Sequence, residues 1–251
     1  MTGIRPARVW AMVAAQAAIR GGRVSAADAC AAVVAAVEVT GAWLTAASDG
    51  QAGHLMRVTD GIGELLAELQ LTLGEGPSLD AAARGGPVLA SDLGSADLAE
   101  RWPGFTPAAQ LAGAAAIFAF PLQIGAIRAG VLGLYRDRPG ELTTPQLGDA
   151  LLFSDAATLL LLDDQAEAAD GLTDGTSAGG QPEDLARHRA QIDQATGMLT
   201  EQLGTGIADA FARLRAYAYS HDLRLADVAG DIVARRLRLR PDSGASLDGE
   251  A

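Results

Sequence analysis

Arginine carries all of the positive side-chain charge in this chain. The sequence has 251 residues with 19 basic side chains, and none of them is lysine. A guanidinium cannot replace the amine of a Schiff base or of a Ser/Lys dyad, and a phosphate-binding P-loop also needs its lysine. The composition therefore excludes these chemistries, and with them a phosphoryl-accepting receiver domain, which depends on a lysine as well.

The other side chains suited to catalysis or metal binding are few and scattered. His54, His188 and His221 lack the close spacing and the cysteine partners that a zinc site requires. No G-x-S-x-G elbow marks a nucleophilic serine. His188 lies between two arginines, as some phosphoacceptor histidines do, but no ATPase domain follows it. We therefore expect no catalytic activity, no metal site and no haem at His54.

Cys30 is the single cysteine and cannot form an internal disulfide, which fits a reducing compartment. It lies in an Ala/Val-rich stretch that predicts a helix, where it would be a small buried hydrophobe. The apolar run 9–19 follows two arginines, as in a signal peptide, but Gln16 and Arg20 interrupt it. Later apolar stretches are too short to span a bilayer. We therefore expect a cytoplasmic protein with no membrane partner.

The net charge divides unevenly along the chain. Residues 1–182 hold 10 arginines against 20 acidic residues, residues 183–240 hold 9 against 8, and the remaining residues add three acids. The formal net charge of −12 therefore belongs mainly to the first part. Because an acidic surface repels nucleic acid, such a partner would have to meet the arginine-richer C-terminal part.

The first 165 residues alternate between helical and extended patterns. Two helices open the chain, and the second begins at Ser25, with Asp28 in the capping-box position, and ends before Gly41. Further helices are predicted over 63–70 and from Thr144 to about Asp164. Apolar segments between them predict strands over 42–47, 55–59, 87–90, 115–121 and 130–135. We take 1–24 as an N-terminal helix and 25–165 as an α+β domain with an antiparallel sheet.

The sequence changes character after this domain. Residues 166–182 are rich in Gly, Ser, Thr and Asp and predict a flexible linker, and 241–251 predict a disordered tail. Residues 183–240 contain three amphipathic patterns and predict a small all-α bundle. Its apolar positions are Leu185, Ile192, Ala195, Leu199 and Leu203, then Ile207, Ala210, Phe211, Leu214 and Ala218, then Leu225, Val228, Ala229, Ile232 and Val233.

The bundle sequence resembles the ANTAR domain, an RNA-binding module of bacterial transcription antiterminators. The resemblance rests on four pieces in order: Arg189-x-x-Ile192-Asp193-Gln194-Ala195-Thr196-Gly197-Met198-Leu199, Ala210-Phe211-x-x-Leu214-Arg215, Ser220-His221, and Leu225-x-Asp227-Val228-Ala229. It implies three helices that bind paired RNA stem-loops in a nascent transcript and stabilise them against an overlapping terminator. The sequence departs from the commonest family pattern at Thr196, where Lys is frequent, and at Thr200, where Met is frequent. Without the Lys, a phosphate contact is lost.

The residues expected to contact RNA are Arg189, Ala195, Thr196, Gly197, Arg215, Tyr219 and Ser220. A glycine inside a helix lowers helix stability by about 1 kcal/mol relative to alanine, so the presence of Gly197 requires an explanation. One explanation is the close approach of an RNA loop to the helix backbone, and the alternative is tight packing between helices. The two arginines would contact phosphate or a splayed base, unless they only form salt bridges on a solvated face. Phe211 is assigned to the core, which leaves Tyr219 as the stacking candidate.

Residues from about 25 to 164 resemble the GAF domain, a small-molecule-sensing α+β fold, in the form that precedes ANTAR domains in actinobacterial proteins. The resemblance rests on residues 73–80, 87–93, 101–105, 118–122 and 130–135. It implies a small-molecule effector of unknown identity. Relatives often have Cys at the position of Ser78, so a redox-sensing thiol is not available there. The Gly74-x-Gly76-Pro77 sequence looks like a phosphate loop but, without a lysine, is predicted to be a tight turn.

The two resemblances together imply a homodimeric, RNA-binding regulator of transcription antitermination. The flanking GAF helices and the helix before Ile192 would build the two-fold dimer. From the charge division we hypothesise that the acidic domain retains the bundle until a signal releases it, so that deletion of residues 1–182 raises RNA affinity at low salt. Two alternatives stay open: a helix-turn-helix-like DNA-binding regulator, since three helices precede an arginine run, and a GAF scaffold or ligand-binding protein without nucleic-acid activity.

Overall fold

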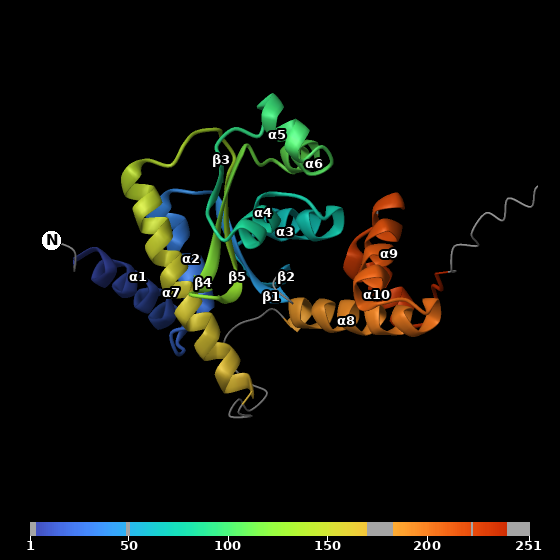
Figure 1. Cartoon of the computed structure of the whole chain (residues 1–251). Helices are drawn as coiled ribbons and strands as arrows, with labels where there is room; N and C mark the ends of the chain where they lie inside the picture. Colours follow the sequence, from blue (N-terminus) through green and yellow to red (C-terminus); the bar gives the residue numbers. More distant parts are fainter. Residues whose placement is uncertain (1–3, 49–50, 170–182, 222, 240–251) are drawn as a thin grey trace, which may run out of the picture. The chain divides into compact units, whose positions relative to one another are not determined.

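The chain forms two compact units that divide between Ala186 and Arg187 in a computed structural model (Figure 1). The structure describes residues 4–48, 51–169, 183–221 and 223–239. Most of the expected linker and all of the expected C-terminal tail lie outside these residues. The two units are described separately below.

The first unit is built on a five-stranded antiparallel sheet with the strand order β2-β1-β5-β4-β3. The strands are β1 (Gly41–Ser48), β2 (Gln51–Val58), β3 (Val88–Ala90), β4 (Ala116–Ile124) and β5 (Ile127–Arg136). All five predicted strands are confirmed. The two with the most continuous apolar sequence, β4 and β5, pair with each other inside the sheet, as expected for strands buried on both faces.

Helices cover both faces of the sheet (Figure 1). One layer consists of α1 (Ile4–Arg20), α2 (Ala26–Val37) and α7 (Thr144–Ala169). The other consists of α3 (Gly61–Leu73), α4 (Pro77–Arg84), α5 (Ala96–Arg101) and α6 (Phe105–Leu111). Each layer encloses its own hydrophobic core, the first around Phe118, Phe120 and Phe153 and the second around Trp43, Trp102 and Phe105. The α+β prediction is confirmed.

Alternation along the central strands distributes side chains between the two cores. Leu44 faces the first core and its neighbour Trp43 the second, as the pleat of a strand requires. Trp43 pairs with Gly133 on β5, and a Cβ atom at Gly133 would overlap the Trp43 indole ring. Glycine is therefore required at 133 by the tryptophan opposite it.

The predicted capping box of α2 is present. The Ser25 backbone N–H donates to Asp28 Oδ2 at 2.9 Å, and the Arg20 guanidinium forms an ion pair with the same carboxylate at 2.8 Å. Asp28 is buried. The helix ends earlier than predicted, at Val37, because Glu38 adopts a left-handed conformation with φ 56°. This network joins the end of α1 to the start of α2.

The short helices α4, α5 and α6 were not predicted from the sequence. Each is shorter than the window in which apolar periodicity becomes visible. The expected turn at Gly74-x-Gly76-Pro77 is present, because Gly74 ends α3 in the left-handed region and Gly76 has φ 131°. Pro77 then begins α4, a position where its missing N–H costs nothing.

The second unit contains α8 (Glu183–Leu203), α9 (Ile207–Ser220) and α10 (Leu225–Val233), which confirms the predicted helical bundle. Its core is aliphatic and includes Ile192, Ala195, Leu199, Ala210, Leu214, Ala218, Leu225, Val228, Ala229 and Ile232. One assignment was wrong, because Ile207, the first residue of α9, is 68% exposed. Leu203, Phe211 and Val233 are only partly buried. Apolar spacing alone did not separate these flanking positions from the core face.

Candidate functional site

Helix α8 has one face in the core of the second unit and one facing outward. Ile192, Ala195 and Leu199 are buried, whereas Arg189 and Gly197 are exposed. The spacing of three and four residues between the buried positions produces this division. Because Ala195 and Gly197 are two residues apart, they point in different directions, and the run of small residues does not form a single surface.

Gly197 lies on the outward face of α8 with open space above it. A Cβ atom built at this position meets no described atom within 4 Å. The alternative explanation for this glycine, tight packing between helices of the bundle, therefore finds no support in the described residues. A residue that weakens the helix and is not required by its neighbours is compatible with close approach of a partner molecule.

Thr196 and Thr200 use their hydroxyl groups inside the helix. Thr196 donates to the Ile192 carbonyl at 2.8 Å, and Thr200 donates to the Thr196 carbonyl at 2.9 Å. Such bonds to the carbonyl four residues earlier are common for threonine in helices. Thr196 is buried and Ala195 is fully buried, so neither side chain is available at the surface of the bundle. If Ala195 and Thr196 contact RNA as expected, they must do so through their backbone atoms, or the bundle must rearrange to expose their side chains.

Arg189 projects from the exposed side of α8. Its Nε lies 3.9 Å from an Asp193 carboxylate oxygen, and both side chains are about half exposed. An exposed pair one helical turn apart contributes only about 0.3–0.5 kcal/mol, so a phosphate group could displace the carboxylate. The salt bridge foreseen for Arg189 is therefore present, but it does not prevent an anion from binding.

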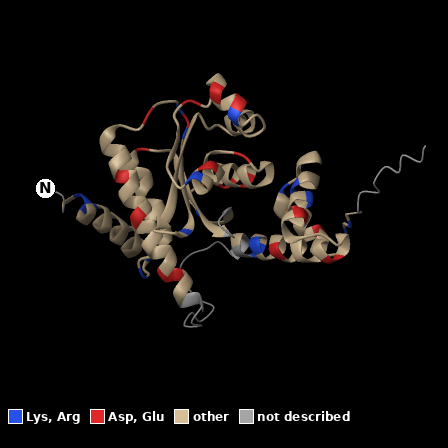
Figure 2. Ribbon diagram, viewed as in Figure 1, with Lys and Arg blue, Asp and Glu red and all other residues tan. Residues whose placement is uncertain are grey.

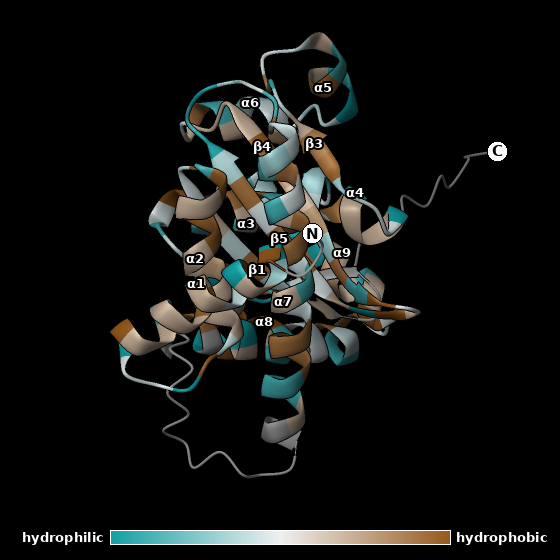
Figure 3. Cartoon of the chain, turned by 90° about the vertical axis from the view of Figure 1, so that its left-hand side faces the viewer, coloured by the Kyte–Doolittle hydropathy of each residue, from teal (hydrophilic) through white to brown (hydrophobic). Residues whose placement is uncertain are grey.

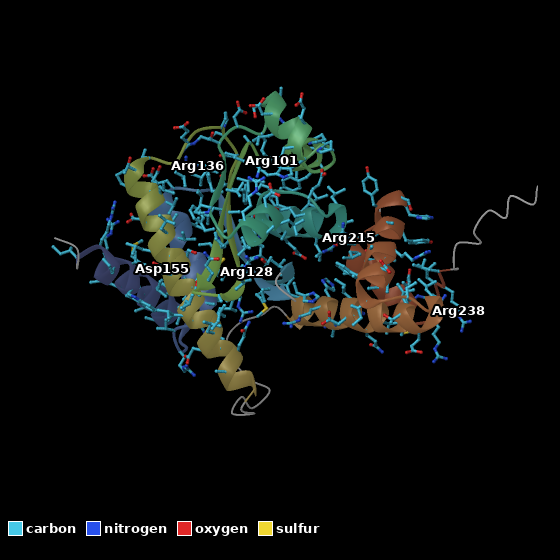
Figure 4. All side chains as sticks on the ribbon, viewed as in Figure 1. Arg101, Arg128, Arg136, Asp155, Arg215 and Arg238 are labelled. Atoms are coloured by element: carbon cyan, nitrogen blue, oxygen red, sulfur yellow. The ribbon has the colours of Figure 1, made fainter. Side chains whose placement is uncertain are left out.

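Arg215 on α9 lies over the ring of Phe211, with its guanidinium carbon 5.7 Å from the ring centroid. Figure 4 labels the side chain. Burial lowers the pKa of Arg215, although a guanidinium remains charged at any physiological pH. The aromatic support restricts the side chain and presents a flat cation. This arrangement suits either a phosphate or an unstacked base.

The end of α9 and the residue after it carry four further polar and aromatic side chains. Tyr219 is 64% exposed, and the Ser220 hydroxyl donates to the Tyr217 carbonyl at 3.1 Å. The His221 ring stacks on the Tyr217 ring, with centroids 4.0 Å apart and planes 19° from parallel. This pair was not predicted from the sequence, although a spacing of four residues on a helix is the signal that predicts it.

The arginine run that follows α10 folds back on the bundle. Arg236 pairs with Asp231 at 2.7 Å, Arg235 adopts a left-handed conformation, and the Gln202 amide donates to the Leu239 carbonyl. Arg238 is exposed on this segment (Figure 4). Both acidic and basic side chains occur along α8 and α9 (Figure 2).

A cavity of small-molecule size is present in the described part of the first unit. It measures about 310 Å³ and opens beside the edge strand β3, with Arg84, Leu89, Arg101 and Trp102 in its lining. Arg101 Nε donates to Asp80 at 2.8 Å, and its guanidinium carbon lies 4.6 Å from the Trp102 ring centroid. Within the described residues, no cluster of His, Cys, Asp or Glu is arranged to hold a metal ion. No helix in the same part of the chain has the length and apolar character needed to cross a lipid bilayer.

Comparison with known families identifies the bundle. Residues 183–233 match the ANTAR domain model, a match that includes α8, α9 and α10. The second unit is therefore an ANTAR domain. A search with the whole sequence finds no significant match among curated proteins.

The chain is also similar to solved GAF domains. A GAF domain from an Acinetobacter phosphoenolpyruvate-protein phosphotransferase is 15% identical, with a TM-score of 0.48 over 67% of this chain and 99% of that chain. A GAF domain of a Coxiella burnetii phosphoenolpyruvate-protein phosphotransferase is 12% identical, with a TM-score of 0.47 over 65% and 98%. The second GAF domain of DevS from Mycobacterium smegmatis is 16% identical, with a TM-score of 0.42 over 65% and 98%.

Proposed function

We propose that this protein is a cytoplasmic regulator of transcription antitermination whose ANTAR domain binds stem-loops in nascent RNA. In this proposal a GAF-like first domain responds to a small-molecule effector and controls the availability of the bundle. The ANTAR match supports the RNA-binding class, and the sequence resemblance to GAF domains supports the sensory role. The regulator would act as a homodimer, since paired stem-loops present two equivalent sites.

The observation that carries the RNA proposal is the open space above Gly197. A loop of single-stranded RNA can bring its sugar-phosphate backbone or a splayed base against a helix that has no side chain at the contact. Arg189 lies on the same helix, with a carboxylate partner that it can exchange for phosphate. Gly197, Arg189, Arg215, Tyr219 and Ser220 would form the contact surface, and Ala195 and Thr196 would support it from within.

The charge on α10 disfavours the DNA-binding alternative. A recognition helix contacts base edges through its N-terminal residues. On α10 the first turn presents the exposed carboxylate of Asp227, and Asp231 follows one turn later. The Asp227 carboxylate would repel the DNA phosphates at the part of the helix that would enter the major groove, whereas the charge of Asp231 is compensated by its ion pair with Arg236.

A direct competition separates RNA from DNA as the ligand. The full chain is titrated into a labelled RNA hairpin with a single-stranded loop, and a DNA duplex of the corresponding sequence competes for it. We expect the hairpin to bind more tightly and the loop, rather than the stem, to determine affinity. Tighter binding of the duplex would contradict the RNA proposal.

Substitution at Gly197 tests the contact itself. Gly197→Leu should abolish hairpin binding while leaving the bundle folded, because a Cβ atom at this exposed position meets no atom of the described residues within 4 Å. Replacing a helical glycine should even stabilise α8 by about 0.5–1 kcal/mol. Ala212→Leu, at an exposed position of α9, adds comparable bulk elsewhere and should retain binding. Equal affinities for the hairpin in both variants would show that Gly197 lies outside the site.

A further inference from the structure

The cavity beside β3 lies at an open edge of the sheet. β3 is the last strand in the order β2-β1-β5-β4-β3, and all of its residues are apolar (Figure 3). The end of α4 and the last residues of α5 complete the walls. The volume of about 310 Å³ lies within the range of small-molecule sites, which measure about 300–1,000 Å³. The cavity is therefore large enough for a ligand of modest size.

The charged side chains that line this cavity are all positive. They are Arg84 and Arg101, and no acidic side chain is among the described residues of the lining. Both guanidinium groups share the carboxylate of Asp80, because Arg101 Nε donates to it at 2.8 Å and Arg84 Nη2 lies 3.7 Å from it. One positive charge is thus in excess, although residues 1–182 hold 10 arginines against 20 acidic residues. This local reversal of sign favours an anion.

The two arginines differ in how firmly they are held. Arg101 donates twice to Asp80, and its guanidinium carbon lies 4.6 Å from the centroid of the Trp102 ring (Figure 4). The Arg84 side chain is 64% exposed, and an exposed pair one helical turn apart is weak. Arg101 is therefore a fixed cation, and Arg84 can leave Asp80 for an anion in the cavity. Guanidinium groups bind carboxylates through two parallel hydrogen bonds.

Apolar side chains make up much of the remaining wall. Leu89, which is 46% exposed, and Leu98 both line the cavity. β3 has only three residues and follows Pro87, which has no N–H to donate, so an added peptide strand would find few partners. The interior of the same helical layer is packed with Trp43 and Phe105, both fully buried. These features favour a small molecule at the sheet edge over a peptide.

We propose that the cavity beside β3 binds a small organic anion, a monocarboxylate with an apolar body. The carboxylate would lie between the guanidinium groups of Arg84 and Arg101, with the apolar part against Leu89 and Leu98. Arg84 would exchange Asp80 for the ligand, so that the bound carboxylate restores the balance of charge. This inference rests on the proposed sensory role of the first domain, and it gives the effector a site and a chemical class.

Calorimetric titration of the full chain, without RNA, tests the site. The probes are phenylacetate and isovalerate, each compared with its neutral amide. Both acids should bind with dissociation constants below about 1 mM, and the amides at least about tenfold more weakly, because an amide cannot accept two charge-assisted hydrogen bonds. Arg84→Gln should weaken the binding of phenylacetate about tenfold. Arg138→Gln, the same change at an exposed position after β5, should leave it unchanged.

Leu89→Glu provides a second test within the cavity. The new carboxylate should pair with Arg84 and prevent binding of either acid, and the thermal transition should not change because position 89 is partly exposed. Leu111→Glu, at a 91% exposed position of α6, should retain binding. Failure of both acids to bind, equal affinity for acid and amide, or unchanged affinity in Arg84→Gln would overturn the proposal. Because these measurements contain no RNA, they can fail while the hairpin experiment succeeds, and the reverse also holds.

Discussion

The imidazole ring of His221 stacks on the phenol ring of Tyr217 at the C-terminal end of α9, with centroids 4.0 Å apart. Tyr219, on the same last turn of α9, is 64% exposed. A stacked pair of rings restrains both side chains, so that a base added to the stack loses less conformational freedom in the protein. If the bundle binds RNA as proposed, we expect an unstacked base to add to this pair of rings.

Substitution of His221 tests this role. His221→Ala should weaken hairpin binding about tenfold, since stacking of a base on an aromatic side chain contributes about 1–3 kcal/mol. His221→Phe preserves the flat ring and should bind within about threefold of the original. Fluorescence anisotropy with a labelled hairpin measures both. If the phenylalanine variant is as weak as the alanine variant, the ring nitrogens rather than stacking hold the RNA.

Thr196→Lys should raise RNA affinity. The Thr196 side chain is buried and its hydroxyl donates to the Ile192 carbonyl, so it offers nothing to a phosphate, whereas the long stem of a lysine can carry its ammonium group out to the surface of the bundle. One added phosphate contact should steepen the slope of log affinity against log salt concentration by about 0.7–1. Ala99→Lys on α5 adds the same charge to the first unit and serves as the control. An unchanged salt slope for Thr196→Lys would place position 196 away from the RNA backbone.

Removal of the Asp28 carboxylate should destabilise the first unit in a pH-dependent manner. Burial alone raises the pKa of Asp28, but hydrogen bonds from Arg20 and Ser25 outweigh it and leave the pKa below its usual value. The carboxylate therefore stabilises the fold above its unfolded pKa of about 4, and this contribution is lost as the pH falls through the folded pKa. Asp28→Ala should lower the free energy of unfolding by about 3 kcal/mol at neutral pH.

Urea denaturation at several pH values measures this effect. The difference between the original chain and Asp28→Ala should shrink as the pH falls below about 4. Asp163→Ala removes the exposed ion pair with Arg23 and should cost about 0.5 kcal/mol or less at any pH. A constant difference for Asp28→Ala across the pH range would show that packing, not charge, explains its effect.

The contact between Gly133 and Trp43 predicts opposite outcomes for two glycine substitutions. Gly133→Ala inserts a methyl group into the space of the Trp43 indole and should cost about 3 kcal/mol or more. Gly86→Ala adds the same methyl group where no atom lies within 4 Å, and it should be nearly neutral. Thermal unfolding followed by circular dichroism distinguishes them. Similar midpoints would contradict the packing described for the sheet.

Sequence patterns predicted the helices and strands whose apolar residues recur regularly over many positions. The apolar runs of β4 and β5 and the three bundle helices were found, because burial of one face imposes that period. Helices α4, α5 and α6 were not found, because they span only 8, 6 and 7 residues. Local propensity is a weak signal at that length.

Prediction of the candidate site was limited for a different reason. A family motif identifies consecutive positions without regard to the direction of each side chain. Ala195, Thr196 and Gly197 were therefore grouped together, although the first two are buried and the third is exposed. The spacing of Tyr217 and His221 permits their stacking, but only the structure fixes the geometry of the rings.

The distribution of the three tryptophans gives the protein two separate optical reporters. Trp43 and Trp102 are fully enclosed in one core, and their indole N–H groups have no hydrogen-bond partner within the described residues. Trp10, on α1, is 39% exposed. Indoles in a dry apolar setting emit at shorter wavelength than hydrated ones. The blue side of the emission band therefore reports on the interior of the sheet domain, and the red side reports on events at the surface of α1.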